Sequence, residues 1–293
     1  MNADVIDSPR LSPHRASTDA VQHIARLAIR SLHTELRLHP KPGLVTPLDT
    51  GSHTDMTADT FMRSLFALRH YFVRIAQAGV ELAPFETLRS LGIAAERRML
   101  VATNEINTHR GAIFAVGMLA AAIGAASSSG QKDALSAEYI RNLLMQRWGS
   151  ALHRHASQSA GATSPVFLID GARTEAARGF PSVFELGLPT LRRSLARGRN
   201  FQHACVDTLF ALIAQIDDTN IVHRGGHHAA DHARDLAQQF MDAGATGDDG
   251  WEHRAQVIGQ RFVMLNISPG GAADLLAASC LIHWISLPQS LLR

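Results

Sequence analysis

The longest apolar run of the sequence extends over fifteen residues, from Ala112 to Ala126, and includes two glycines. A helix that is apolar on every side must be buried inside a protein or a membrane. Fifteen residues are fewer than the roughly 18 to 20 that a transmembrane helix needs. The run therefore predicts a central helix that is buried by the rest of a globular chain, with no membrane partner.

Apolar residues recur every three or four positions along most of the remaining chain, which is the period of an amphipathic helix. One stripe extends from Val21 to Leu36 with Thr18 as its expected cap, and another extends from Phe61 to Ile75 behind Thr57. Pro84 fits the first turn of a third helix. We expect further helices near residues 136–147, 170–179, 190–197, 202–216, 227–242, 251–265 and 271–286.

Only residues 165–169 suggest a strand, so the predicted fold class is all-α. We expect a single helical catalytic domain over residues 16–293, with catalytic loops at helix ends, after a disordered Pro/Ser/Arg-rich segment at residues 1–15. Cys205 and Cys280 lie in apolar helical patterns typical of core residues.

Composition and charge narrow the class of protein. The N-terminus has no apolar core and is not a secretory signal, and 46% hydrophobic with 18% charged residues is ordinary for a globular, cytoplasmic protein. A formal net charge of +2 is too close to balance to favour nucleic acid as a partner.

Four segments between the predicted helices combine glycine or proline with charged and amide residues. Simple connectors seldom need such residues, and loops held on a rigid scaffold often carry catalytic groups. The segments are 39–56 (HPKPGLVTPLDTGSHTDM), 104–114 (NEINTHRGAIF), 217–226 (DDTNIVHRGG) and 266–276 (NISPGGAADLL).

In segment 39–56, prolines on both sides of Lys41 stiffen its backbone, and Gly43 permits a sharp turn or the close approach of a ligand. Ser52, His53 and Asp55 follow just before the next helix. The alternative is an exposed connector with an aspartate near a helix start.

Segment 104–114 places Asn107, His109, Arg110 and Gly111 directly before the apolar helix. The free N–H groups and the positive dipole end of a helix N-terminus suit an anion, above all phosphate. The alternative is simple capping, with the histidine and the arginine in solvent.

Segment 217–226 begins with Asp217 and Asp218 at the end of a predicted apolar helix, followed by Asn220. Carboxylates and an amide are hard oxygen ligands suited to Mg²⁺ that is shared with substrate phosphates, which His223 and Arg224 would contact. Carboxylates at a helix C-terminus oppose the helix dipole, which favours a bound cation there. The alternative is a solvated helix end.

Segment 266–276 opens the last helix with Ser268, Gly270 and Gly271, whose small size exposes the helix N-terminus to a ligand such as phosphate. Asp274 lies one turn inside the helix. It would bind metal, act as a base or simply complement the dipole. An ordinary helix start is the alternative.

The histidine-rich stretch HRGGHHAADH, residues 223–232, has two interpretations. His228 and His232 are four residues apart and share a helix face, as in a zinc site, which would suit an all-α metal-dependent phosphohydrolase acting on a nucleotide. However, no third ligand stands at a recognisable spacing. We favour a phosphate cradle in which Gly225 and Gly226 open the helix.

Five sets of motifs resemble, in the same order, those of the triphosphoribosyl-dephospho-coenzyme A synthases. The resemblance implies a helical fold and a transferase reaction. In that reaction the 2′-hydroxyl of 3′-dephospho-coenzyme A attacks the ribose C1 of ATP, adenine leaves, and the triphosphate stays on the transferred ribose. The motifs are HPKPGLV with GSHTDM, NTHRGAIF, GARTEAARGFPSV, DTNIVHRGG and NISPGGAADLLA.

The resemblance supports the positions of the site residues, while their roles are hypotheses from chemistry. Mg²⁺ would be held near three aspartates: Asp55, Asp217 and Asp218. The catalytic groups would be Asp218, Asp274 and His109, with either aspartate as the base that accepts the hydroxyl proton. Asp218→Asn is expected to abolish turnover without unfolding the protein. Substrate and phosphate would be bound by Lys41, Gly43, Ser52, His53, Asn107, Arg110, Gly111, Asn220, His223, Arg224, Gly225, Gly226, Ser268, Gly270 and Gly271.

The resemblance also implies partners. The substrates would be ATP and 3′-dephospho-coenzyme A, and the product would pass to a prosthetic-group transferase and then to an acyl carrier protein. The stretch TPLDTGSHTDM is more similar to the malonate decarboxylase branch of the family than to the citrate lyase branch. Residues 148–169 do not follow the family pattern and predict a variable or mobile loop. Such apolar helices are also compatible with a homodimer.

Overall fold

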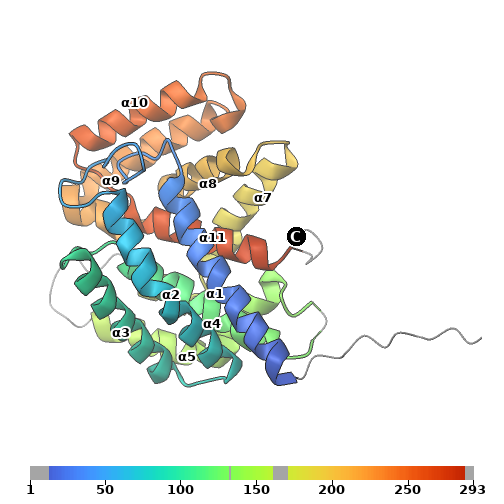
Figure 1. Ribbon diagram of the computed structural model, residues 1–293. Coiled ribbons are helices and arrows are strands. Elements are labelled where there is room, and N and C mark those ends of the chain that lie inside the picture. The colour runs from blue at the N-terminus through green and yellow to red at the C-terminus, as the bar shows by residue number, and fades with distance from the viewer. Residues whose placement is uncertain (1–12, 132, 161–170, 288–293) are drawn as a thin grey trace, which may run out of the picture.

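The computed structural model describes residues 13–131, 133–160 and 171–287, and within them it contains eleven α-helices and no strand (Figure 1). The all-α, single-domain prediction is therefore confirmed. A π-helical turn (Ser182–Gly187) leads into α7, and a 3₁₀ turn (Ala245–Gly247) precedes α10. The helices are α1 (Pro13–Arg37), α2 (Ala58–Val80), α3 (Phe85–Thr103), α4 (Arg110–Ser127), α5 (Ala137–Ala160), α6 (Ala172–Ala177), α7 (Leu188–Ala196), α8 (Phe201–Gln215), α9 (Thr219–Asp242), α10 (Trp251–Met264) and α11 (Gly270–Ile285).

Helix α4 is the central helix, as its uniformly apolar sequence predicts. It packs against α1, α2, α3, α5 and α11. By length and composition it could cross a membrane, but 78% of it is buried inside this protein, as in a core helix. The crossing with α2 depends on small residues, because a Cβ on Gly124 would lie 2.2 Å from the carbonyl oxygen of Ala76.

Helix α11 lies between two groups of helices. It packs against α1 and α4 on one side and against α7, α8 and α9 on the other (Figure 1). Cys205 of α8 and Cys280 of α11 are buried free thiols whose sulfur atoms lie 3.8 Å apart. Both cysteines are thus core residues, as predicted.

The first helix begins earlier than its cap signal predicts. Helix α1 starts at Pro13 and runs through Thr18, so the prediction of Thr18 as its cap is wrong. The predicted domain boundary between residues 15 and 16 falls inside this helix, and residues 1–12 lie outside the described residues. By contrast, Thr57 is the N-cap of α2, as predicted.

Helix α5 is longer than its sequence signal. It continues to Ala160, so the first half of region 148–169 is helical rather than a loop. The helix continues because no proline or glycine pair interrupts it after Gly149. Residues 161–170, which include the predicted strand, lie outside the described residues.

The boundary between α8 and α9 also differs from the prediction. Helix α8 ends at Gln215, and Asp218 is the N-cap of α9 rather than the end of the preceding helix. Its carboxylate thus meets the favourable end of a helix dipole, so the dipole argument for a cation is wrong at this position. The helix start predicted near residue 227 corresponds to a kink inside α9 at Gly226, whose φ is +75°.

Candidate active site

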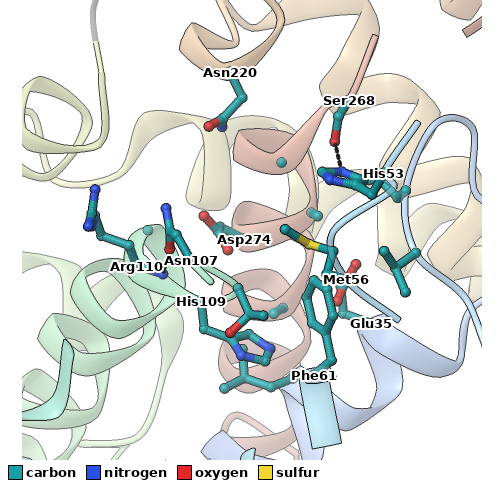
Figure 2. A pocket seen from close by; sticks show the side chains of 18 of the residues that line it. Glu35, His53, Met56, Phe61, Asn107, His109, Arg110, Asn220, Ser268 and Asp274 are labelled. Carbon is teal, nitrogen blue, oxygen red and sulfur yellow. Dashed lines mark hydrogen bonds between the residues drawn. The ribbon is translucent and has the colours of Figure 1, made fainter. Parts of the chain in front are cut away.

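A pocket of about 240 Å³ lies between α1, α4, α9, α11 and the loop of residues 39–56 (Figure 2). All four polar segments contribute to its lining, so the fold brings together most of the predicted site residues. Those that line the pocket are Lys41, His53, Asp55, Asn107, His109, Arg110, Gly111, Asn220, His223, Arg224, Ser268, Gly270 and Asp274.

The inner part of the pocket is mostly apolar, apart from His109 and the ion pair of Glu35 with Lys41, and its mouth is polar. In Figure 2, Phe61 and His109 lie at one end, Asn220 and Ser268 lie at the other, and Asp274 lies between them. Sequence patterns did not single out the apolar lining, because these residues look like ordinary core positions. They are Leu32, Leu44, Val45, Met56, Phe61, Ala273 and Ala277.

Lys41 is buried in an ion pair inside the pocket. Its Nζ lies 2.5 Å from Oε1 of Glu35 and also donates to the backbone oxygen of Glu35 at 2.9 Å. Both side chains are almost fully buried. The sequence predicted that this ammonium group is free to bind phosphate. In the structure, the carboxylate of Glu35 engages it instead.

Glu35 is a lining residue that sequence reasoning missed. A signal was present, because Glu35 follows Leu32 by three positions and Ala28 by seven, which places a charged residue on the apolar stripe of α1. A carboxylate is rarely buried unless it is paired. Its position therefore indicated a partner, but not which one.

His109 is a buried, neutral histidine at the N-cap of α4. Its Nδ1 lies 2.7 Å from Oγ of Ser64, and its ring meets the ring of Phe61 edge-on at 5.0 Å. Burial, with a smaller effect of the nearby Lys41 charge, lowers the pKa of His109 to about 3. Its Nε2 has no hydrogen-bond partner among the residues that the structure describes. His109 is therefore suited to a hydrogen bond with a neutral group rather than to charge pairing with phosphate.

Asp274 lies against the first turn of α4. A Cβ on Gly111 would come within 2.0 Å of its Oδ2, and the N–H of Ala112 donates to its carboxylate. Burial raises the pKa of Asp274 well above its usual range, and the charges of Glu35 and Asp218 raise it further. The site therefore favours the protonated carboxyl and would also be relieved by a nearby cation.

Asp218 joins the N-termini of α9 and α11 and does not line the pocket. Its Oδ1 accepts from the backbone N–H of Asn220 at 2.9 Å and from Nδ2 of the same residue at 3.1 Å, while its Oδ2 accepts from the N–H of Ala272 at 2.9 Å. Burial raises the pKa of Asp218, and these hydrogen bonds oppose the shift. Gly271 permits this contact, because a Cβ there would lie 3.0 Å from the carboxylate.

Three predicted phosphate contacts, Gly43, Ser52 and Arg224, anchor the loop of residues 39–56. Gly43 has a φ of +70°, and a Cβ there would lie 2.2 Å from the carbonyl oxygen of Ile267. Ser52 Oγ donates to the same oxygen at 2.6 Å. Nη2 of Arg224 donates to the carbonyl of Ser52 at 2.5 Å, and its Nε donates to Asn266 at 3.0 Å. Arg224 thus both lines the pocket and holds the loop in place.

The mouth of the pocket is polar and partly exposed. Nε2 of His53 lies 2.7 Å from Oγ of Ser268, and its Nδ1 lies 3.6 Å from Oδ1 of the exposed Asp55. Burial and the Arg224 charge lower the pKa of His53, and Asp55 partly opposes them. Arg110 is paired with Glu96 at 2.5 Å but remains largely exposed.

The predicted metal ligands are not assembled into one site. Asp217 is exposed and pairs with Arg234 at 2.5 Å, outside the pocket lining. Gly225 and Gly226 are also exposed and do not line the pocket. Across the described ranges, no group of three His, Cys, Asp or Glu residues is arranged to hold a metal ion. The histidine-rich stretch therefore gives no support to a zinc phosphohydrolase in this part of the chain.

The sequence is similar to one family over most of its length. It matches the family described as ATP:dephospho-CoA triphosphoribosyl transferase over residues 21–291. It is 36% identical over 268 residues to a protein of Acinetobacter calcoaceticus, which covers 89% of this chain and 91% of the relative. It is also 38% identical over 274 residues to a protein of Pseudomonas fluorescens (strain Pf0-1), covering 90% and 92%.

A third relative, from Salmonella typhimurium (strain LT2), is 34% identical over 297 residues, covering 95% of each chain. The first two relatives carry the name "Probable 2-(5''-triphosphoribosyl)-3'-dephosphocoenzyme-A synthase", and the third carries the same name followed by the number 1. No solved structure matches the chain.

Proposed function

Because the chain belongs to the ATP:dephospho-CoA triphosphoribosyl transferase family, we propose that its pocket transfers the triphosphoribosyl group of ATP to 3′-dephospho-coenzyme A and releases adenine. One observation supports the assignment of this reaction to the pocket. Four polar segments, far apart in the sequence, meet around a cavity that has an apolar inner part and a cationic and amide-rich mouth. Such a division fits a nucleotide, which has an apolar base at one end and a charged triphosphate at the other.

The division of the pocket indicates how ATP is oriented. The adenine fits the apolar inner part beside Phe61, and the triphosphate fits the mouth, where Arg110, His223 and Arg224 lie. The pocket volume of about 240 Å³ is below the roughly 300–1,000 Å³ of typical ligand pockets, so two nucleotides do not both fit inside it. The triphosphate and most of the acceptor must therefore extend through the mouth, with only the end of the acceptor that carries the attacking hydroxyl inside the pocket.

His109 is the polar contact for the nucleoside in the inner part. Its unpartnered Nε2 is buried in the lining, and a buried polar atom costs free energy until it finds a partner. A neutral imidazole suits the ring nitrogens or the amino group of adenine. Ser64 would set which nitrogen carries the proton.

Mg²⁺ is a proposed companion of ATP rather than the occupant of a protein cage. Mg²⁺ usually binds one or two carboxylates together with substrate phosphates. Asp55 fits this role because it is an exposed carboxylate at the mouth, whereas Asp217 lies outside the pocket and the acceptors of Asp218 are engaged. When bound, the ion would neutralise charge on the triphosphate.

The destination of the product is also a proposal. Because of the stretch TPLDTGSHTDM, we assign the chain to the malonate decarboxylase branch of the family. The acyl carrier protein of malonate decarboxylase would then receive the prosthetic group through a separate transferase. Purified acyl carrier proteins of malonate decarboxylase and citrate lyase, each with its own transferase, would test this. Loading of the citrate lyase carrier alone would contradict it.

The activity is tested by chromatography of a reaction that contains the protein, ATP and Mg²⁺, with and without 3′-dephospho-coenzyme A. We expect adenine only when the acceptor is present, together with a product that retains three phosphates. Omission of Mg²⁺ should slow the reaction strongly. Release of ADP or phosphate without adenine would refute the transferase assignment.

A further inference from the structure

Two carboxyl groups line the same pocket in different electrostatic surroundings. Glu35, on α1, is paired with the buried ammonium of Lys41, whereas Asp274, on α11, forms no ion pair with any lysine or arginine of the described residues. Figure 2 shows the two side chains reaching the pocket from different elements. Active sites that use one acid and one base often contain two carboxyl groups whose surroundings favour opposite protonation states.

We propose that Glu35 is a catalytic residue that accepts the proton of the attacking hydroxyl, while Asp274 donates a proton to the departing adenine. This inference rests on the proposed function. A bond forms between the hydroxyl oxygen and ribose C1, and the bond between C1 and the adenine nitrogen breaks. Its electron pair stays with adenine, which takes the proton of Asp274. Exchange with water then returns a proton to Asp274 and removes one from Glu35.

The ion pair leaves part of Glu35 available. Lys41 occupies Oε1 and also binds the backbone oxygen of Glu35, so it fixes the orientation of the carboxylate. Within the part of the chain that the structure describes, Oε2 receives no hydrogen bond. An oriented carboxylate with one unoccupied oxygen in a cavity is suited to accept a proton.

The other candidate bases are less suited to this step. Burial lowers the pKa of His109 to about 3, which makes it a weak base at neutral pH. Asp218 does not line the pocket, and its oxygens already accept three hydrogen bonds. Asp55 is exposed at the mouth.

Asp274 is suited to the opposite role. Glu35 faces it from α1 and Asp218 from the N-cap of α9, and burial with these two negative charges raises its pKa. A carboxyl with a raised pKa holds its proton to higher pH and is therefore suited to act as a general acid. Adenine is a poor leaving group as an anion, so a proton delivered to its ring lowers the barrier to departure.

The first test is Glu35→Gln, which keeps the shape and a hydrogen-bond acceptor for Lys41. We expect single-turnover adenine release per folded molecule to fall roughly 10²–10⁴-fold, the usual contribution of a general base, while ATP binding by calorimetry changes little. The melting temperature should fall, because the buried ammonium of Lys41 loses its counter-ion. Turnover close to that of the wild type would overturn the inference. The wild-type assay comes first: if it releases no adenine with the acceptor present, the proposed function itself has failed.

A second variant separates proton transfer from charge pairing. In Glu35→Ala, added formate and nitrate are both small planar anions that can pair with Lys41, but only formate accepts a proton readily. Recovery of adenine release with formate and not with nitrate would support the base. Equal recovery with both anions would show that Glu35 serves only as the counter-ion of Lys41 and would overturn the inference.

The role of Asp274 as the acid is tested separately, with a substrate analogue. In 7-methyl-ATP the base is already cationic and leaves without taking a proton. The loss of rate in Asp274→Asn should therefore be much smaller with 7-methyl-ATP than with ATP, whereas the loss in Glu35→Gln should be the same with both. Equal losses in Asp274→Asn would refute its role as the acid.

Discussion

The junction of α9 and α11 and the pocket beside it each contain a buried aspartate near a helix N-terminus. Asp218, in the junction, accepts hydrogen bonds from Asn220 and Ala272 through both of its oxygens. Asp274, in the pocket, receives one from the N–H of Ala112 and faces the cavity. Burial raises the pKa of both. A carboxylate whose acceptors are filled holds structure together, and one with unfilled acceptors at a cavity is available for chemistry.

Apart from the Glu35 variants, the largest effect on activity is expected from Asp274→Asn. Turnover should fall roughly 10²–10⁴-fold, because the amide cannot transfer a proton. The free energy of unfolding should depend less on pH in the variant than in the wild type. The folded-state pKa of Asp274 lies above the unfolded value, so its contribution to the free energy of unfolding is full below about pH 4 and is lost as pH rises through the raised pKa. The asparagine does not titrate.

Urea unfolding of both proteins at pH 5 and pH 8, with adenine-release assays on the same samples, would check this. The variant should lose less stability than the wild type between the two pH values. Normal turnover combined with reduced stability would instead place Asp274 in the same structural role as Asp218.

Gly111→Ala should be the next most severe change. Its Cβ would lie 2.0 Å from Oδ2 of Asp274, so the carboxyl must move away from its position over α4. We expect turnover to fall by about one to two orders of magnitude, as displacements near 1 Å in an active site do. Gly92→Ala on α3 is the matched control, because its nearest contacts would be at 4.0 Å. Equal effects of the two variants on adenine release would show that the position of Asp274 is not critical.

Asp218→Ala should mainly reduce stability. Loss of an N-cap costs about 0.5–2 kcal/mol, and a buried N–H left without a partner costs about 1–3 kcal/mol, so we expect a decrease of roughly 1.5–5 kcal/mol in the free energy of unfolding. Turnover per folded molecule should fall much less than in Asp274→Asn. This reverses the sequence-based expectation that Asp218→Asn abolishes turnover without unfolding. Denaturant titration and adenine release, measured together, decide between the two, and full inactivation at unchanged stability would favour the original expectation.

Asp217→Asn should have the smallest effect. The side chain is exposed, and its pair with Arg234 contributes no more than about 1 kcal/mol, as is usual for surface ion pairs. Adenine release and its dependence on Mg²⁺ concentration should match the wild type. A marked rise in the Mg²⁺ requirement would instead restore Asp217 as a metal ligand.

The sequence by itself determined the fold class, the central helix and the segments that surround the pocket. Apolar periodicity is a local property, so it predicts which stretches are helical and which face is buried. The composition of the loops is local as well, and it identified His109, Asp274 and most of the pocket lining before any contact was known.

Only the tertiary structure decided which partners each polar group contacts. Lys41 looked like a phosphate ligand until the structure paired it with Glu35, and Asp218 looked like a metal ligand until its oxygens met the N-terminus of α11. Gly43 likewise proved to be a packing contact against Ile267. Whether a charge is available for chemistry depends on burial and on which donors and acceptors already engage it. In this protein those partners come from segments far apart in the sequence, which no local pattern can bring together.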